Sequence, residues 1–428
     1  MEIVDSVIEV VRDVCAALPD KRRGRNRHFV MADIGMAAFS VFFTQCPSFL
    51  AHQRQLLEGQ GCSNCHTLFK MTDIPCDNHI RAMLDPVEPS QFDPVFEAVV
   101  HKLEACGGLT DLRCLGDHVL IALDGTQYHR STKIHCPRCS TVTKGNKTEC
   151  FHSMVQASLV APGHNRAIPL QPAFIAPQDG SAKQDCESRA CRRWLTEHGR
   201  TYARLNPIYL GDDLYSCQPI CEAVLATGGH FLFVCKPDSH PTLTEYLAGV
   251  ELDERVEMVK RGKQRFRYTY RWMLDLPLRD GKDALHVNWF SIEITDPNGH
   301  ITYRNSFITD LAIDHQNVVE LAACGRARWK VENETFNTLK TKGYNLEHNF
   351  GHGHNNLAAV LAVLNLLAFA CHTLADLADD LWKRARIKAH TRLGFFNHLR
   401  SITVFVVFPS WDDLLKTLAL EKPLPRPP

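Results

Sequence analysis

The sequence has no excess of either charge, because its 428 residues include 48 Lys and Arg against 48 Asp and Glu. This balance excludes an overall electrostatic attraction to nucleic acid, so contact with a polyanion has to come from a local patch. Low-complexity segments are absent apart from the last few residues, which excludes a mainly disordered chain. With 45% hydrophobic residues, a chain of this length can bury a large core in about two or three structural units.

A secretory signal is also missing from the start of the sequence, where residues 1–5 are acidic and amphipathic. The 17 cysteines are scattered along the chain, so we expect reduced thiols and a cytoplasmic protein. The most apolar stretch, residues 357–377, contains Asn365 and His372 and has helical periodicity. It therefore predicts a buried helix, and we expect no membrane contact.

The hydrophobic pattern divides the chain into regions of different texture. Residues 1–115 have the periodicity of helices, whereas residues 116–420 alternate short apolar runs of strand type with helical stretches. The second region predicts an α/β domain with a mixed sheet, and the β-rich part at about residues 235–307 is interpreted as an insertion into it. The proline-rich residues 421–428 are expected to be disordered.

Two aspartates follow apolar runs of strand type. Asp124 comes directly after residues 119–123, and Asp212 comes after residues 208–210, with Asp213 as the alternative. A carboxylate at the end of a buried strand lies where open α/β sheets bind ligands. Carboxylates that converge from different elements can hold the Mg²⁺ or Mn²⁺ ions used to cut phosphodiesters. A turn or a helix cap explains either aspartate taken alone.

A predicted helix over residues 325–340 supplies a third acid. Arg328 and Glu332 are four residues apart and share a face, and Glu334 is the alternative ligand. Trp329 and Phe336 have the spacing to pack inward. An ordinary amphipathic helix with one ion pair explains the same pattern.

Taken in order, Asp124-Gly125-Thr126, residues 211–215 and residues 328–333 resemble the DDE transposases of bacterial insertion sequences. The resemblance is to the group with a β insertion between the second Asp and the Glu, and it covers nearly the whole chain. The Glu helix of that group has the pattern Tyr, two residues, Arg, three residues, Glu, six residues, Lys. Arg328 and Glu332 keep this spacing.

The remaining positions of that pattern differ. Gly325 replaces the Tyr, Leu339 replaces the Lys, and Lys340 comes one residue late.

The resemblance implies an RNase H-like catalytic core in which Asp124, Asp212 and Glu332 hold two Mg²⁺ or Mn²⁺ ions. It implies cleavage of a phosphodiester at the end of a DNA element, followed by attack of the freed 3′-OH on target DNA. The expected partners are double-stranded DNA and a second copy of the chain, assembled on that DNA as a homodimer. Two alternatives stay open: an RNase H-like nuclease without strand transfer, and a catalytically silent DNA-binding protein derived from a transposase.

Basic residues give the expected DNA contacts. The helical region 1–115 is the candidate DNA-binding region, and five cations lie within residues 21–27. A solvated loop is the competing interpretation of this cluster. The residues expected to contact DNA are Arg22, Arg23, Arg25 and Arg27 from the cluster, and Arg328 and Lys340 near the active site.

A cysteine-rich loop follows the first aspartate. Cys136 and Cys139 form C-x₂-C, and Cys150 and His152 follow ten residues later as C-x-H. Four ligands of this type can close a tetrahedral zinc site, and free thiols are the competing interpretation.

Overall fold

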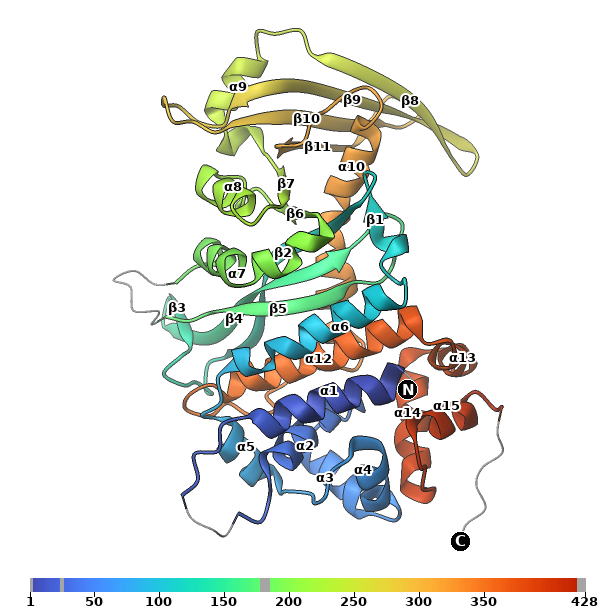
Figure 1. Ribbon diagram of the computed structural model, residues 1–428. Coiled ribbons are helices and arrows are strands. Elements are labelled where there is room, and N and C mark those ends of the chain that lie inside the picture. Colours follow the sequence, from blue (N-terminus) through green and yellow to red (C-terminus); the bar gives the residue numbers. More distant parts are fainter. Residues whose placement is uncertain (1–2, 24–26, 178–184, 422–428) are drawn as a thin grey trace.

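The computed structural model describes residues 3–23, 27–177 and 185–421, and Figure 1 shows a helical layer at one end and a long sheet through the rest. Residues 422–428 of the predicted tail lie outside the described residues. The predicted mixed α/β architecture is confirmed by an 11-stranded sheet with parallel and antiparallel pairs.

Both ends of the chain build the helical layer. It contains α1 (Ile3–Ala17), α2 (Met31–Phe43), α3 (Phe49–Leu57), α4 (Gly61–Phe69), α5 (Asp77–Leu84), α6 (Asp93–Ala105), α12 (Leu357–Ala378), α13 (Asp380–Lys388), α14 (Arg392–Phe405) and α15 (Trp411–Leu418). Short 3₁₀ turns occur at η1 (Pro89–Phe92) and η2 (Thr110–Leu112). The N-terminal helices thus share a hydrophobic core with the C-terminal ones, and a DNA-binding role for residues 1–115 stays a prediction.

The apolar helix α12 lies at the centre of this layer. It is long and apolar enough to cross a membrane, but 89% of its most hydrophobic window is buried inside the protein. It packs against α2, α6 and the sheet strand β5 (Ile168–Ile175). The stretch is therefore a core helix of this fold, as its Asn365 and His372 indicate.

Five strands form the part of the sheet nearest the helices, in the order β5, β4, β2, β6, β7. Their bounds are β2 (His118–Ser131), β4 (Lys147–Val160), β6 (Pro207–Gly211) and β7 (His230–Val234). β2, β6 and β7 are parallel, whereas β4 is antiparallel to both β2 and β5. The short strands β1 (Arg113–Cys114) and β3 (Ser140–Lys144) pair with β2 and β4.

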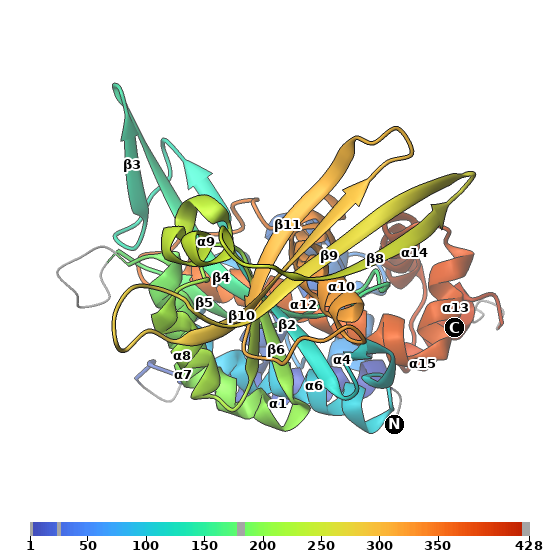
Figure 2. The same cartoon turned by 90° about the horizontal axis from the view of Figure 1, so that it is seen from above.

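The predicted β insertion extends the same sheet. The strands β8 (Asp253–Arg261), β9 (Gln264–Pro277), β10 (His286–Thr295) and β11 (Ile301–Thr309) pair in antiparallel order, and β11 joins the edge of β7. Figure 1 shows these strands at the end of the molecule opposite the helical layer, and Figure 2 shows the same strands from above. The short helices η4 (Pro237–Ser239) and α9 (Pro241–Leu247) precede them.

Alternate residues of β2 face two different cores, as the two-residue period of a strand requires. Ile121 and Leu123 pack with α7 (Glu187–Tyr202), α8 (Gln218–Leu225) and the helical layer. Leu120 and Ala122 pack on the other face, against the helical segment that follows β11. That segment consists of α10 (Val318–Arg326), η5 (Ala327–Trp329), η6 (Val331–Phe336) and α11 (Asn337–Thr341), and η3 (Ala203–Leu205) ends α7.

Candidate active site and metal centre

The two aspartates predicted at strand ends lie at matched positions along the neighbouring parallel strands β2 and β6. The prediction of a strand end is wrong for Asp124, because β2 pairs with β4 through Asp124 and continues to Ser131, whereas β6 ends one residue before Asp212. The register pairs Ala122 of β2 with Leu210 of β6, so Asp124 and Asp212 each come two residues after a paired residue. Adjacent strands are about 4.8 Å apart, which brings the two backbones close together just beyond the last residue of β6. Asp124 Oδ1 accepts a hydrogen bond from Gly125 N at 2.9 Å, and Asp212 Oδ1 accepts one from Leu214 N at 2.9 Å.

The alternative residue Asp213 has a different environment. Its carboxylate accepts hydrogen bonds from the backbone N of Lys236 at 2.6 Å and from the hydroxyl of Ser239. His240 Nε2 lies 3.5 Å from Asp213 Oδ1. Asp213 thus ties β6 to the turn after β7, which leaves Asp212 as the better ligand candidate.

Glu332 is linked to Asp124 by a shared arginine. Arg328 Nη2 lies 2.9 Å from Glu332 Oε1, and Nη1 lies 3.5 Å from Asp124 Oδ2. η6, which carries Glu332, is a π-helical segment, a widened turn that is rare in helices and often occurs at functional sites. The shared contact with Arg328 therefore brings Glu332 near Asp124.

A fourth carboxylate, Glu187, also lies at this site, although the sequence pattern did not single it out. Tyr215 donates a hydrogen bond to Glu187 Oε1 at 2.7 Å. A Cβ atom at Gly125 would lie only 2.2 Å from Glu187 Oε2. The carboxylate therefore packs directly over the backbone next to Asp124, and only a glycine permits this approach.

The pKa of Asp124 is shifted by its surroundings, because its side chain is only 13% exposed and three other carboxylates lie near it. Burial raises the pKa of Asp124 to about 7; Arg328 opposes this rise, while Glu332, Glu187 and Asp212 add to it. Carboxylate oxygens are the donors that Mg²⁺ and Mn²⁺ prefer, so the residues present fit a divalent cation. Among the described residues no three carboxylates are grouped closely enough to hold an ion as they stand, and Arg328 contacts both Asp124 and Glu332.

Trp329 and Lys340 come from the helical segment that carries Glu332, and each had a predicted role near the site. Trp329 was expected to pack inward, but its side chain is 45% exposed, and Lys330 Nζ lies 5.3 Å from its ring centroid. The inward prediction is wrong because the turn changes from 3₁₀ at η5 to π at η6, which breaks the helical period assumed from the sequence. Lys340 Nζ pairs with Glu347 Oε1 at 2.8 Å, and its contact with DNA stays a prediction.

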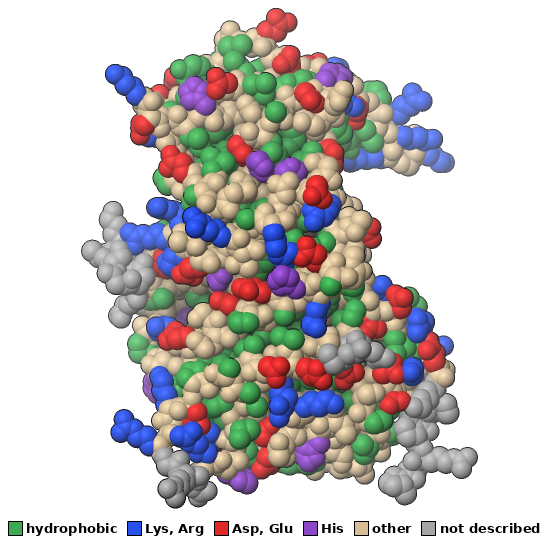
Figure 3. Space-filling view, viewed as in Figure 1, with side chains coloured by type: hydrophobic (Ala, Val, Ile, Leu, Met, Phe, Trp, Pro, Cys, Tyr) green, Lys and Arg blue, Asp and Glu red, His purple; other side chains and the backbone are tan. Residues whose placement is uncertain are grey.

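The basic N-terminal cluster is partly engaged within the protein. Asp20 pairs with Arg22 at 2.9 Å and with Arg27 at 3.3 Å, and Arg22 also donates to the carbonyl of Phe29. Arg23 is exposed, and Arg25 lies outside the described residues. Figure 3 shows blue and red side chains interspersed on the visible face, without a continuous basic band.

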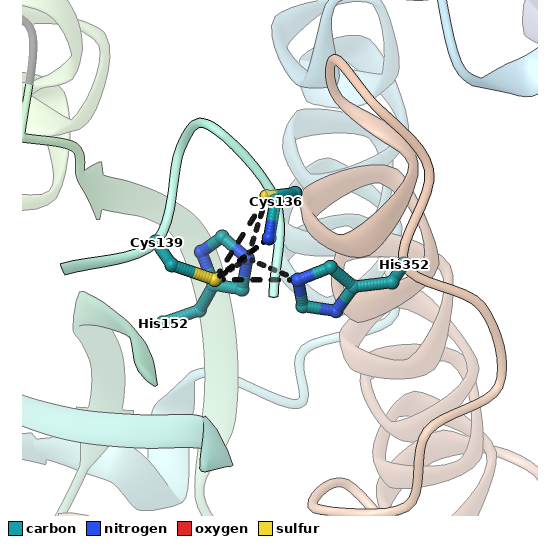
Figure 4. Close-up of side chains that lie close together, drawn as sticks. All are labelled: Cys136, Cys139, His152 and His352. Carbon is teal, nitrogen blue, oxygen red and sulfur yellow. Dashed lines mark hydrogen bonds between the residues drawn. The ribbon is translucent and has the colours of Figure 1, made fainter. Parts of the chain in front are cut away.

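A second cluster, of cysteine and histidine, lies around the loop between β2 and β3. Cys136 and Cys139 come from the loop, His152 comes from β4, and His352 comes from the segment before α12; Figure 4 shows the four side chains pointing toward one another. Their ligand atoms all lie within 4.8 Å of one another. Burial lowers the pKa of His152 to about 3 and that of His352 to about 4, so both imidazoles are neutral at pH 7, the form that binds metals.

The prediction that Cys150 belongs to this cluster is wrong, and His352 occupies the fourth position. Cys150 and His152 are two residues apart on β4, so their Cα atoms are about 6.6 Å apart. The Nε2 atom of His152 lies 3.4 Å from the sulfur of each loop cysteine, whereas the thiol of Cys150 is outside the group of four ligand atoms.

Comparisons with known proteins give a likeness in structure. No family model matches the sequence, and no curated protein matches it. Among solved structures, the chain is similar to a piggyBac transposase in a synaptic complex with hairpin DNA, with 9% sequence identity and a TM-score of 0.41. The similarity covers 99% of this chain and 80% of that one.

Proposed function

We propose that the chain is a metal-dependent DNA-cutting and DNA-joining enzyme of the DDE transposase type. The observation that carries the proposal is the matched placement of Asp124 and Asp212 on adjacent parallel strands, with Glu332 joined to Asp124 through Arg328. Two further features support it. The strand order β5, β4, β2, β6, β7 with β4 antiparallel is the order expected if the core is RNase H-like, and the β8–β11 strands lie between the second aspartate and the glutamate.

Asp124, Asp212 and Glu332 would hold two Mg²⁺ or Mn²⁺ ions. When bound, such ions activate the attacking water or 3′-OH and neutralise charge that develops on the phosphate. In this proposal, Arg328 offsets the repulsion between Asp124 and Glu332 in the metal-free protein. With metal bound, its guanidinium is released to contact the phosphate of the DNA.

Glu187 is assigned to the same carboxylate group. The Tyr215 hydroxyl orients it, and the bare backbone of Gly125 gives it access to Asp124. A fourth carboxylate raises the negative charge of the pocket and hence its attraction for divalent cations.

The remaining assignments follow from the same proposal. The partners are double-stranded DNA and a second copy of the chain on that DNA, and the protein is cytoplasmic. Phosphate contacts come from the cluster residues and from two residues near the active site: Arg22, Arg23, Arg25, Arg27, Arg328 and Lys340.

The test uses Mg²⁺ and labelled duplexes taken from the DNA that flanks the chain's own coding sequence, with a supercoiled plasmid as target. The proposal expects nicks or breaks with free 3′-OH ends at one edge of the flanking DNA, and joining of those ends to the plasmid. Cleavage without joining would assign the nuclease alternative instead. Binding without cleavage would support the silent DNA-binding alternative instead. The absence of both binding and cleavage would reject the proposal.

A further inference from the structure

The cluster of Cys136, Cys139, His152 and His352 has the dimensions of a tetrahedral zinc site. Zinc lies about 2.3 Å from sulfur and about 2.05 Å from nitrogen, so tetrahedral ligands are about 3.8 Å apart for S to S, 3.6 Å for S to N and 3.3 Å for N to N. The two sulfurs are 3.9 Å apart. The two Nε2 atoms are 3.3 Å apart, and three of the four S to N distances are 3.4, 3.4 and 3.3 Å. The fourth, between Cys136 and His352, is within 4.8 Å.

Hydrogen bonds alone do not account for this arrangement. His152 Nε2 has three neighbours, Cys136 Sγ and Cys139 Sγ at 3.4 Å and His352 Nε2 at 3.3 Å. A ring nitrogen carries either one proton or one lone pair, so it satisfies one such neighbour and not three. Four donor atoms that each face the same centre are what one shared cation requires.

We propose that these four side chains bind one structural zinc ion, which links the catalytic sheet to the start of α12. The site is separate from the carboxylate pocket and does not depend on the proposed DNA chemistry. Two thiolates and two neutral imidazoles balance the charge of Zn²⁺, as expected for a closed site without a catalytic water. His352 contributes the ligand most distant in sequence from the C-x₂-C loop.

The contacts around the cluster show what the ion would hold in place. Arg138, between the two cysteines, donates to the side chain of Asn356, the residue that precedes α12. On the other side, His152 is four residues from Gln156, the strand partner of Asp124. Four residues span about 13 Å of strand, so the ion would fix the hairpin that carries Asp124 against the core helix.

Metal analysis of the purified full-length chain after dialysis against EDTA tests the proposal. We expect about one zinc per chain in the wild type. Cys139→Ala and His352→Ala should each lower zinc affinity by more than about tenfold, since each removes a ligand. The matched controls are Cys150→Ala, which removes the cysteine excluded by the geometry, and His348→Ala, from the same segment as His352. Both should keep the wild-type zinc content.

Two results would overturn the proposal. One is a wild-type protein that stays zinc-free even after reconstitution with ZnCl₂. The other is loss of zinc in Cys150→Ala together with full zinc content in His352→Ala. His352→Cys keeps the test decisive if an alanine variant fails to fold, because cysteine is also a zinc ligand. Cobalt-loaded His352→Cys should show about 1.5 times the wild-type thiolate-to-metal absorption, since its thiolates rise from two to three. Unchanged absorption would place residue 352 outside the metal site.

Discussion

The guanidinium of Arg328 lies 3.5 Å from the carboxylate of Asp124, measured from Nη1 to Oδ2. The same guanidinium also serves Glu332, so one positive charge faces two acids. Burial nevertheless raises the pKa of Asp124 to about 7. The contact therefore compensates only part of the cost of a buried negative charge, and the metal-free pocket is a place where a cation would stabilise the fold.

Asp124→Asn should make the metal-free protein more stable at pH 8. The folded pKa of Asp124 is raised above its unfolded value of 3.8, so the folded state binds the extra proton between about pH 4 and pH 7. Stability from this group is thus lost as the pH rises through that window, by up to about 4 kcal/mol. Asparagine mimics the neutral form and avoids the loss. Denaturant unfolding in EDTA at pH 5 and pH 8 measures the free energy of unfolding of both proteins and hence this difference.

The same variant should lose the response to metal. Wild-type protein at pH 8 should gain thermal stability on addition of Mg²⁺ or Mn²⁺, whereas Asp124→Asn should gain much less. Equal stability of the two proteins at pH 8, together with an equal response to Mg²⁺, would remove Asp124 from the cation site.

Gly125→Ala should displace Glu187, because the added Cβ would lie 2.2 Å from Glu187 Oε2. If Glu187 supports the metal site, we expect a loss of cleavage rate of about 10- to 100-fold, the range for groups that support metal ligands. Gly249→Ala is the matched control, since a Cβ there meets no atom within 4 Å. In a double-mutant cycle, adding Glu187→Ala to Gly125→Ala should cost little more. Fully additive losses would mean that the two residues act independently.

His52→Gln should reduce the sensitivity of the fold to acid. His52 is fully buried, its Nε2 lies 2.8 Å from Ser40 Oγ, and burial lowers its pKa to about 3. The unfolded chain takes up a proton below about pH 6.5 and the folded chain does not, so stability falls as the pH drops below that value, by about 2 kcal/mol at pH 5. Glutamine does not titrate and should remove this loss. Unfolding curves at pH 7.5 and pH 5 measure the difference, and the exposed His398→Gln is the control. If the wild type and His52→Gln lose the same stability between pH 7.5 and pH 5, His52 is not the source of the acid sensitivity.

Neutralising Arg22, Arg23, Arg25 and Arg27 together should weaken DNA binding and flatten its salt dependence. Each lost phosphate contact lowers the slope of log K against log salt by about 0.9, so four contacts give a change of about 3 to 4. Asp20 already pairs with Arg22. A triple variant that neutralises only Arg23, Arg25 and Arg27 should therefore change the slope almost as much as the quadruple variant does. Titrations of duplex DNA at several salt concentrations measure it, and an unchanged slope would identify a solvated loop.

The strands before the two aspartates and the β-rich texture of residues 235–307 were predictable because they depend on local patterns. The apolar run before Asp212 marks both the strand β6 and its end, whereas the run before Asp124 marks the strand β2 but not its end, which lies at Ser131. The β-rich texture of the insertion also appears in the residues themselves, although its pairing with β7 extends the sheet and is not visible in the sequence.

Other parts of the sites depend on long-range packing, which no local pattern shows. His352 replaces Cys150 in the zinc cluster because the fold brings the start of α12 beside a loop about 200 residues earlier. Glu187 is identified only by its closeness to Gly125. Trp329 was misplaced because helical periodicity assumes a uniform turn, and the turn widens at η6.

The most direct test of the account is the rate of Mg²⁺-dependent cleavage of the flanking DNA in matched variants. Asp124→Ala, Asp212→Ala and Glu332→Ala should each abolish cleavage and leave DNA affinity nearly unchanged, because each removes a metal ligand. Asp213→Ala and Glu334→Ala, which lie one and two residues away, should keep most of the activity. Three results would contradict the proposed carboxylate site: cleavage at the wild-type rate by Asp124→Ala, by Asp212→Ala with loss in Asp213→Ala, or by Glu332→Ala with loss in Glu334→Ala.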